Sequence, residues 1–127
     1  MLGGVEIPFE RGLDGWTDGD VITHAVIDAL CGAAGLGDIG TLFPPGDEQL
    51  RGISSLILLE RIVVLMCERN MAIVNVDVTV VAEEPRLAPS TAEMRRHLAE
   101  SLRLSVDCVS IKPKTNEHMG FAGRGEG

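Results

Sequence analysis

The chain has 127 residues, 45% of them hydrophobic, and a formal net charge of −8. This length suits a single domain over residues 1–127, because two smaller domains would each lack a sufficient core. The acidic balance disfavours a nucleic-acid binder, and Glu60 and Arg61 interrupt the most apolar stretch, residues 53–67, so no membrane span is expected.

Residues 21–34 carry apolar side chains at helical spacing, which predicts a first helix that ends at the glycines following it. Thr17 and Asp20 indicate a capping box at its start. Asp20, His24 and Asp28 follow one another at intervals of four, so we expect them on one face of this helix. That face is predicted to carry whatever chemistry the helix performs.

A second helix is predicted over residues 54–70, capped by Ser54 or Ser55, with its apolar stripe in the core. After this helix, the spacing of the apolar residues changes from the period of a helix to the period of a strand. In residues 73–82, valines alternate with polar residues, which is typical of a half-buried strand.

Pro85 and Pro89 bracket a predicted loop. Ser90 and Glu93 then indicate a second capping box, in front of a third helix over residues 94–102. Beyond it, the chain is expected to return to the sheet.

A second strand is predicted over residues 106–111, and residues 113–127 read as a polar, glycine-rich tail. A short strand is also predicted at residues 5–7. The order of helices and strands predicts an α+β domain, a two-layer sandwich in which helices lie on one face of a mixed sheet.

Four runs of the sequence, taken together and in this order, resemble one known family. They are residues 18–25 (DGDVITHA), 37–44 (GDIGTLFP), 75–79 (NVDVT) and 114–127 (KTNEHMGFAGRGEG). Each run alone is a weak signal, but the set covers nearly the whole chain. The chain resembles the 2-C-methyl-D-erythritol 2,4-cyclodiphosphate synthases.

This resemblance implies a phosphorus-oxygen lyase of the non-mevalonate isoprenoid pathway. The family cyclises 4-diphosphocytidyl-2-C-methyl-D-erythritol 2-phosphate to the 2,4-cyclodiphosphate and releases cytidine monophosphate. Such a reaction depends on positioning and charge neutralisation and needs no side-chain nucleophile. The resemblance also implies a cytoplasmic homotrimer with active sites shared between subunits. The alternative is a catalytically silent, truncated relative that retains a cytidine-nucleotide pocket.

Two metal sites are implied by the resemblance. His24 matches a histidine that binds zinc or manganese, with the remaining protein ligands expected on an Asp-x-His strand upstream of Met1; alternatively, His24 is an ordinary polar helix residue. Glu117 matches a catalytic carboxylate that contacts magnesium on the substrate phosphates, and hard cations prefer such oxygen ligands. Its alternative is an exposed loop carboxylate.

The remaining site residues are also implied by the resemblance. Those matched to the cytidine pocket are Ala82, Pro85, Arg86, Leu87 and Ala88. Thr115 is expected beside the phosphates as a second catalytic residue. A plain turn before a helix is the alternative explanation of the two prolines.

Other substrate contacts are expected away from that loop. Asp38 and Gly40 match positions that bind the methylerythritol hydroxyls, with Asp28 as a supporting polar group. Phe121 and Arg124 match substrate positions in the tail, and Arg124 also matches an arginine near the trimer axis. A solvated tail charge is the alternative for Arg124.

Some positions depart from the family pattern. Trp16 stands where a histidine is common, Pro45 stands where an aspartate is common, and a final strand is expected beyond Gly127. The three cysteines are far apart and form no C-x-x-C pair, so reduced thiols of a cytoplasmic protein are expected.

Overall fold

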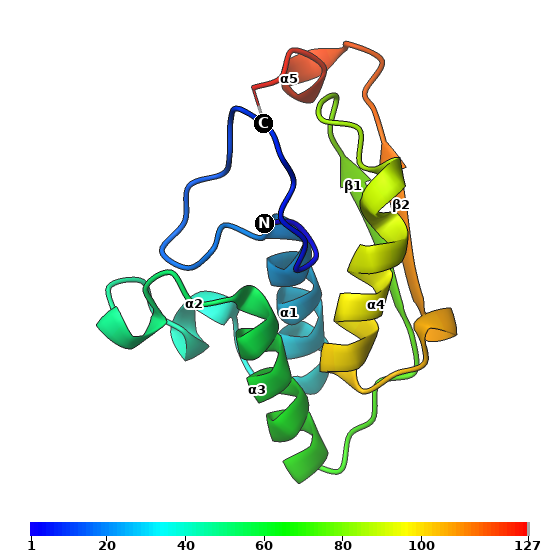
Figure 1. The fold of residues 1–127 in the computed structure, drawn as a ribbon. Coiled ribbons are helices and arrows are strands. Elements are labelled where there is room, and N and C mark those ends of the chain that lie inside the picture. The colour runs from blue at the N-terminus through cyan, green and yellow to red at the C-terminus, as the bar shows by residue number, and fades with distance from the viewer. Residues whose placement is uncertain (127) are drawn as a thin grey trace.

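Three long helices and a pair of strands dominate the fold (Figure 1). The computed structural model describes residues 1–126. The long elements are α1 (Val21–Ala34), α3 (Ser55–Glu68), β1 (Val76–Val81), α4 (Thr91–Leu102) and β2 (Val109–Lys114). Shorter helices are α2 (Ile39–Leu42) and α5 (Gly120–Gly123), with 3₁₀ turns at Glu48–Leu50, Ala88–Ser90 and Val106–Cys108.

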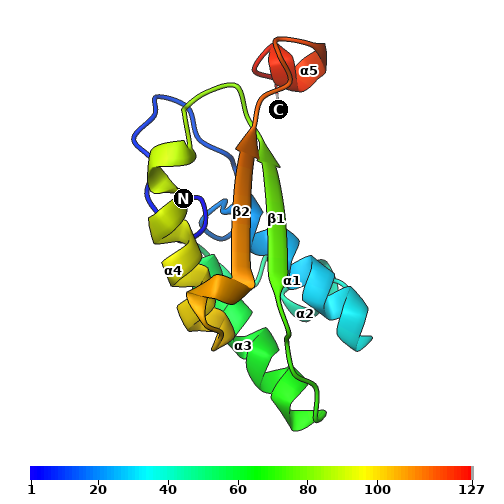
Figure 2. The ribbon, with the colours of Figure 1, turned by 90° about the vertical axis from the view of Figure 1, so that its right-hand side faces the viewer.

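Strands β1 and β2 are parallel, with Val76 opposite Val109 and Val81 opposite Lys114. The helix α4 connects them, as a crossover must in a parallel pair. The expected mixed sheet is therefore wrong for the described residues, because this sheet contains only the parallel pair. Figure 2 shows the strand pair in front of the long helices, so the helices lie on one of its faces.

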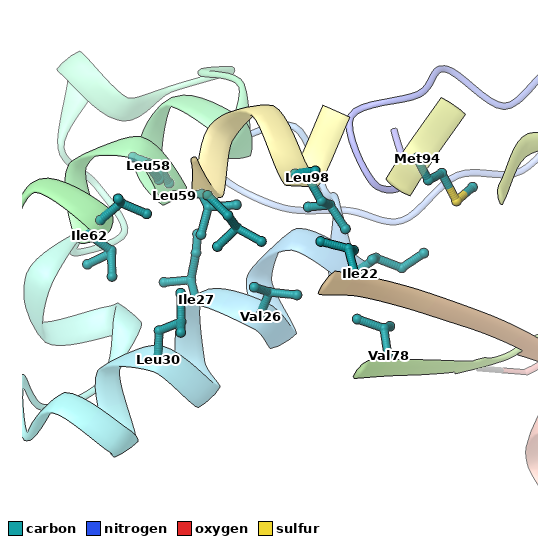
Figure 3. Close-up of a cluster of buried hydrophobic side chains, with 14 of the residues drawn as sticks. Ile22, Val26, Ile27, Leu30, Leu58, Leu59, Ile62, Val78, Met94 and Leu98 are labelled. Carbon is teal, nitrogen blue, oxygen red and sulfur yellow. The ribbon is translucent and has the colours of Figure 1, made fainter. Parts of the chain in front are cut away.

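The core lies where α1 is enclosed by the other long elements. Ile27, Leu59 and Leu98 are almost completely buried, and they come from α1, α3 and α4 respectively. Figure 3 shows Ile22 and Val26 of α1 between Leu98 and Val78. The apolar stripes that predicted the helices thus face one another, and α1 is held by contacts on several sides.

The strand boundaries differ from the predicted ones. The first strand begins at Val76 instead of residue 73, because its pairing with β2 begins there. The second is preceded by the turn Val106–Cys108 and runs three residues further than expected, so β2 ends and α5 forms within the predicted tail.

The predicted strand at residues 5–7 is absent from the described structure. Only an isolated bridge forms, between Leu2 and Val5. Gly3 and Gly4 have positive φ angles of 55° and 75°, so the chain turns back at this point. A side chain at Gly3 would also collide with Met94, which leaves no room for another residue type.

Both predicted capping boxes are wrong, although both helices exist. Asp20, not Thr17, is the N-cap of α1, and its side chain accepts a hydrogen bond from Thr23 N. Ser90 precedes α4 without forming a side-chain cap bond. Gly35 ends α1 in the left-handed conformation, as its position suggested. Within residues 1–126, no helix is long and apolar enough to cross a bilayer.

Candidate active site

The loops that follow β1 and β2 form a cavity of about 160 Å³ at one end of the strand pair. The two strands end together because Ala82 N donates to Lys114 O at 3.0 Å. The cavity is lined by Ala82, Glu83, Pro85, Arg86, Leu87, Ala88, Pro113, Lys114 and Thr115. The five residues matched to a nucleotide pocket therefore lie together with Thr115, although 27 or more residues separate them in the sequence.

The cavity has an apolar part and a charged part, in which the cations of Arg86 and Lys114 outnumber the carboxylate of Glu83. Leu87 is buried, and Pro113 is partly buried. Arg86 and Lys114 are exposed and bring two cationic groups to the lining. Such a combination suits a ligand that carries an uncharged ring on one side and phosphates on the other.

The loop between β2 and α5 carries Thr115 and Glu117. Glu117 is exposed, and its amide donates to the Thr115 hydroxyl oxygen at 3.4 Å. Glu117 and His118 both have left-handed backbones, with φ of 53° and 62°. The loop thus presents a carboxylate to solvent directly beside the cavity residue Thr115.

Glu83 joins this loop to the end of β1. Its Oε1 accepts hydrogen bonds from the amides of Asn116 (2.7 Å) and His118 (3.3 Å). Sequence reasoning did not single out this residue. The available signal was a carboxylate one position beyond the predicted strand over residues 73–82, and its partners more than 30 residues away could not be recognised from it.

Phe121 and Arg124 lie in and after α5, which Figure 1 places beyond the tips of the strands. The Phe121 side chain is 65% exposed. Arg124 Nη2 lies 3.0 Å from Glu126 Oε2, and both side chains are exposed. Gly123 packs so closely on the His118 backbone that a side chain there would collide with it, which holds α5 against the Glu117 loop.

His24 lies in the first turn of α1 and is half-buried. Its Nε2 is 3.1 Å from the Thr17 hydroxyl. Among residues 1–126, no three His, Cys, Asp or Glu side chains are grouped to bind a metal ion. Catalytic zinc sites normally have three protein ligands, so the described residues around His24 do not fit such a site on their own.

The run from Asp18 to Asp20 has a structural role. Asp20 is completely buried and accepts hydrogen bonds from the amides of Gly3, Gly4 and Thr23 at 2.7–3.0 Å and from the Thr23 hydroxyl at 2.7 Å. It ties the N-terminal turn to the start of α1. The prediction that Asp20 shares a functional face with His24 and Asp28 is therefore wrong.

Asp18 performs a similar task for α3. Its carboxylate accepts hydrogen bonds from the Ser55 amide at 3.1 Å and from the Ser55 hydroxyl. Between the two aspartates, Gly19 has a φ of 73°, and a Cβ there would come within 2.6 Å of Leu13 O. The glycine is thus required for the chain to bring both carboxylates to the starts of two helices.

Asp28, Asp38 and Gly40 form a second group, around the C-terminal half of α1 and α2. Asp28 is exposed, while Asp38 is the N-cap of α2 and accepts from Thr41 N at 2.8 Å. Hydrogen bonds from the Thr41 hydroxyl and amide lower the pKa of Asp38. In both ribbon views α2 lies well away from α5, so one chain does not bring Asp38 next to Glu117 (Figures 1 and 2).

The residues that depart from the expected pattern also take part in the structure. Trp16 Nε1 donates to Asp47 O at 2.8 Å, and Arg51 lies 5.7 Å from the centre of the Trp16 ring. Pro45 is exposed in the same segment. Trp16 thus anchors the chain between α2 and α3.

Comparison with known proteins identifies one family. A model of the YgbB family matches residues 1–127. A curated 2-C-methyl-D-erythritol 2,4-cyclodiphosphate synthase from Dehalococcoides mccartyi is 55% identical over 100% of this chain and 81% of its own length. The enzyme of that name from Methylobacillus flagellatus is 51% identical over 100% of this chain and 79% of its own length.

Solved structures agree with these relatives. A structure described as 2C-methyl-D-erythritol-2,4-cyclodiphosphate synthase in a CDP-bound form superposes with a TM-score of 0.86 at 34% identity, covering 92% of this chain and 78% of that one. IspF from Plasmodium falciparum in complex with CDP superposes with a TM-score of 0.79 at 32% identity, covering 98% of this chain and 74% of that one.

Proposed function

Because the chain belongs to the YgbB family, we propose that it is a 2-C-methyl-D-erythritol 2,4-cyclodiphosphate synthase, a lyase of isoprenoid biosynthesis. It converts 4-diphosphocytidyl-2-C-methyl-D-erythritol 2-phosphate to the cyclic diphosphate and releases cytidine monophosphate. The observation that carries the proposal is the cavity at the strand ends, which lies in a fold whose relatives bind CDP. The match over the whole chain favours this function over a silent relative.

The reaction exchanges one phosphorus-oxygen bond for another. An oxygen of the substrate's 2-phosphate attacks the β-phosphorus, and the bond to cytidine monophosphate breaks. Attacking and departing groups are both anionic, so the protein has to hold them in line and offset their repulsion. Arg86 and Lys114, which line the cavity, supply positive charge for this purpose.

Thr115 is suited to orient a phosphate. Its hydroxyl oxygen already accepts a hydrogen bond from the Glu117 amide, so the hydroxyl proton remains free to be donated to a phosphate oxygen. The exposed carboxylate of Glu117 fits a magnesium ion, which is bound in proteins through one or two carboxylates and the substrate phosphates. When bound, that ion would supply further charge neutralisation.

Pyrimidine selectivity is the first expected result. CDP should bind at the cavity at least about tenfold more tightly than ADP, because related structures hold CDP and polar contacts to a base discriminate by this much or more. Isothermal calorimetry with magnesium present measures both dissociation constants. Equal affinities would remove the nucleotide pocket from the proposal.

We also propose that the chain acts as a homotrimer. Two groups of site residues lie apart in one chain, one around Asp38 and one around Glu117, so a complete site would form only where two copies meet. The strand face that the helices leave uncovered offers a surface for such a contact (Figure 2).

Sedimentation velocity measures this assembly. The expected species has three times the 13.6 kDa mass of one chain. A protein that is only monomeric at micromolar concentration would contradict the shared site.

We place the reaction in the cytoplasm, since Cys31, Cys67 and Cys108 are free thiols and reducing compartments preserve them.

A further inference from the structure

Glu83 is a largely enclosed carboxylate in an otherwise exposed region. Its side chain is 11% exposed, whereas residues 115–118 are all exposed. It lies two residues after the end of β1, and its partners lie 33 and 35 residues further along the chain. The largely enclosed position and the long-range contacts show that this carboxylate is held in one place by the fold.

The two hydrogen bonds of Glu83 lie on either side of Glu117. Both go to the same oxygen, Oε1, at 2.7 Å from the amide of Asn116 and 3.3 Å from the amide of His118. Fixing the amides before and after a residue fixes the direction in which its side chain leaves the backbone. Glu83 therefore holds the base of the Glu117 side chain.

The backbone at this point needs such support. Glu117 and His118 are consecutive residues with positive φ, which is unfavourable for residues that have a Cβ and persists only where the surroundings impose it. Bonds within the loop, such as Asn116 Nδ2 to Met119 O at 3.1 Å, close its ends. Glu83 accepts two hydrogen bonds from this loop, so it can offset this penalty.

We propose that Glu83 is a positioning residue, which sets the direction of the Glu117 carboxylate and so its ability to hold magnesium. This inference rests on the proposed function. Glu83 acts through the backbone of the loop, as a hydrogen-bond acceptor, and its second oxygen lies 3.8 Å from His118 Nδ1. Because one oxygen accepts both amide protons, an amide oxygen in its place would serve as well.

Three substitutions separate this role from a general effect on the fold. Glu83→Met keeps the length of the side chain and removes the acceptor. Glu83→Gln keeps an acceptor oxygen and removes the charge. Glu84→Met is the matched control, because the neighbouring Glu84 is exposed and lies outside the cavity lining. Glu83→Asp, too short to reach both amides, serves if Glu83→Met does not fold.

The first measurement is hydrogen exchange of the Asn116 and His118 amides, followed by NMR in the protein without ligand. Exchange should accelerate at least about tenfold in Glu83→Met, which loses the acceptor, and change little in Glu83→Gln, which keeps an acceptor oxygen. The second is the magnesium concentration that gives half-maximal turnover. It should rise about tenfold in Glu83→Met and stay within about threefold of the original in Glu83→Gln and Glu84→Met.

Unchanged exchange in Glu83→Met would overturn the inference, and so would an equal loss in Glu83→Met and Glu83→Gln. An altered melting temperature with an unchanged magnesium requirement would also overturn it, because a purely structural residue would give that result. The exchange measurement needs no substrate. If the original protein showed neither CDP binding nor turnover, the proposed function would fail while the contact between Glu83 and the loop was still being tested.

Discussion

Glu117→Gln should lower kcat/KM at least about 100-fold, because it removes the carboxylate charge that holds magnesium on the substrate phosphates. An effect of this size corresponds to about 3 kcal/mol of lost transition-state stabilisation. The substituted side chain has the same shape, and the original is exposed, so the fold should not change. Turnover is measured as release of cytidine monophosphate across a range of magnesium concentrations.

Glu100→Gln is the control for this variant. Glu100 is an exposed carboxylate on α4, and its removal changes the net charge by the same amount. Its kcat/KM should stay close to that of the original protein. If the two variants are equally active, Glu117 is a solvent-exposed loop carboxylate, and neither a magnesium site nor a positioning role for Glu83 would be needed there.

Asp20→Ala should lower the free energy of unfolding by about 3 kcal/mol or more, because each buried polar group left without a partner costs about 1–3 kcal/mol. The substitution would leave the amides of Gly3, Gly4 and Thr23 without their acceptor. A change of this size corresponds to a decrease in melting temperature of roughly 10 °C or more in a domain of this length. Chemical and thermal unfolding followed by circular dichroism measure both quantities.

Asp14→Ala is the control, since Asp14 is exposed and lies in the same connecting segment. It should change stability by less than about 0.5 kcal/mol. Asp20→Asn should lie between the two, because it keeps one acceptor oxygen and turns an amide nitrogen toward a hydrogen-bond donor. Equal stability of Asp20→Ala and Asp14→Ala would show that the buried carboxylate does not hold the N-terminal turn to α1.

Asp20 and Glu117 show that acidic residues in similar sequence motifs can have different roles. In the sequence, both Asp20 and Glu117 stand in short polar runs beside glycines, and both suggested chemistry. In the structure, Asp20 is completely buried and accepts its hydrogen bonds from the N-terminal turn and from Thr23. Glu117, in contrast, is exposed beside the cavity. Their burial, not their residue type, separates the structural carboxylate from the candidate catalytic one.

The sequence by itself determined the three long helices and the family. Apolar spacing within α1, α3 and α4 is a local property, so their positions could be predicted to within a few residues. The loop residues Pro85 to Ala88 could be assigned to a pocket through the family resemblance, which rests on short runs of the sequence. These features depend on neighbours along the chain.

Tertiary structure alone decided the strand ends and the partners of the polar residues. Val76 begins β1 because Val109 begins β2, and neither boundary is visible in its own segment. Asp18 reaches Ser55 across 37 residues, and Glu83 reaches Asn116 across 33. A hydrogen bond depends on where two groups meet after folding, and hydrophobic periodicity reports only which face of each segment is buried.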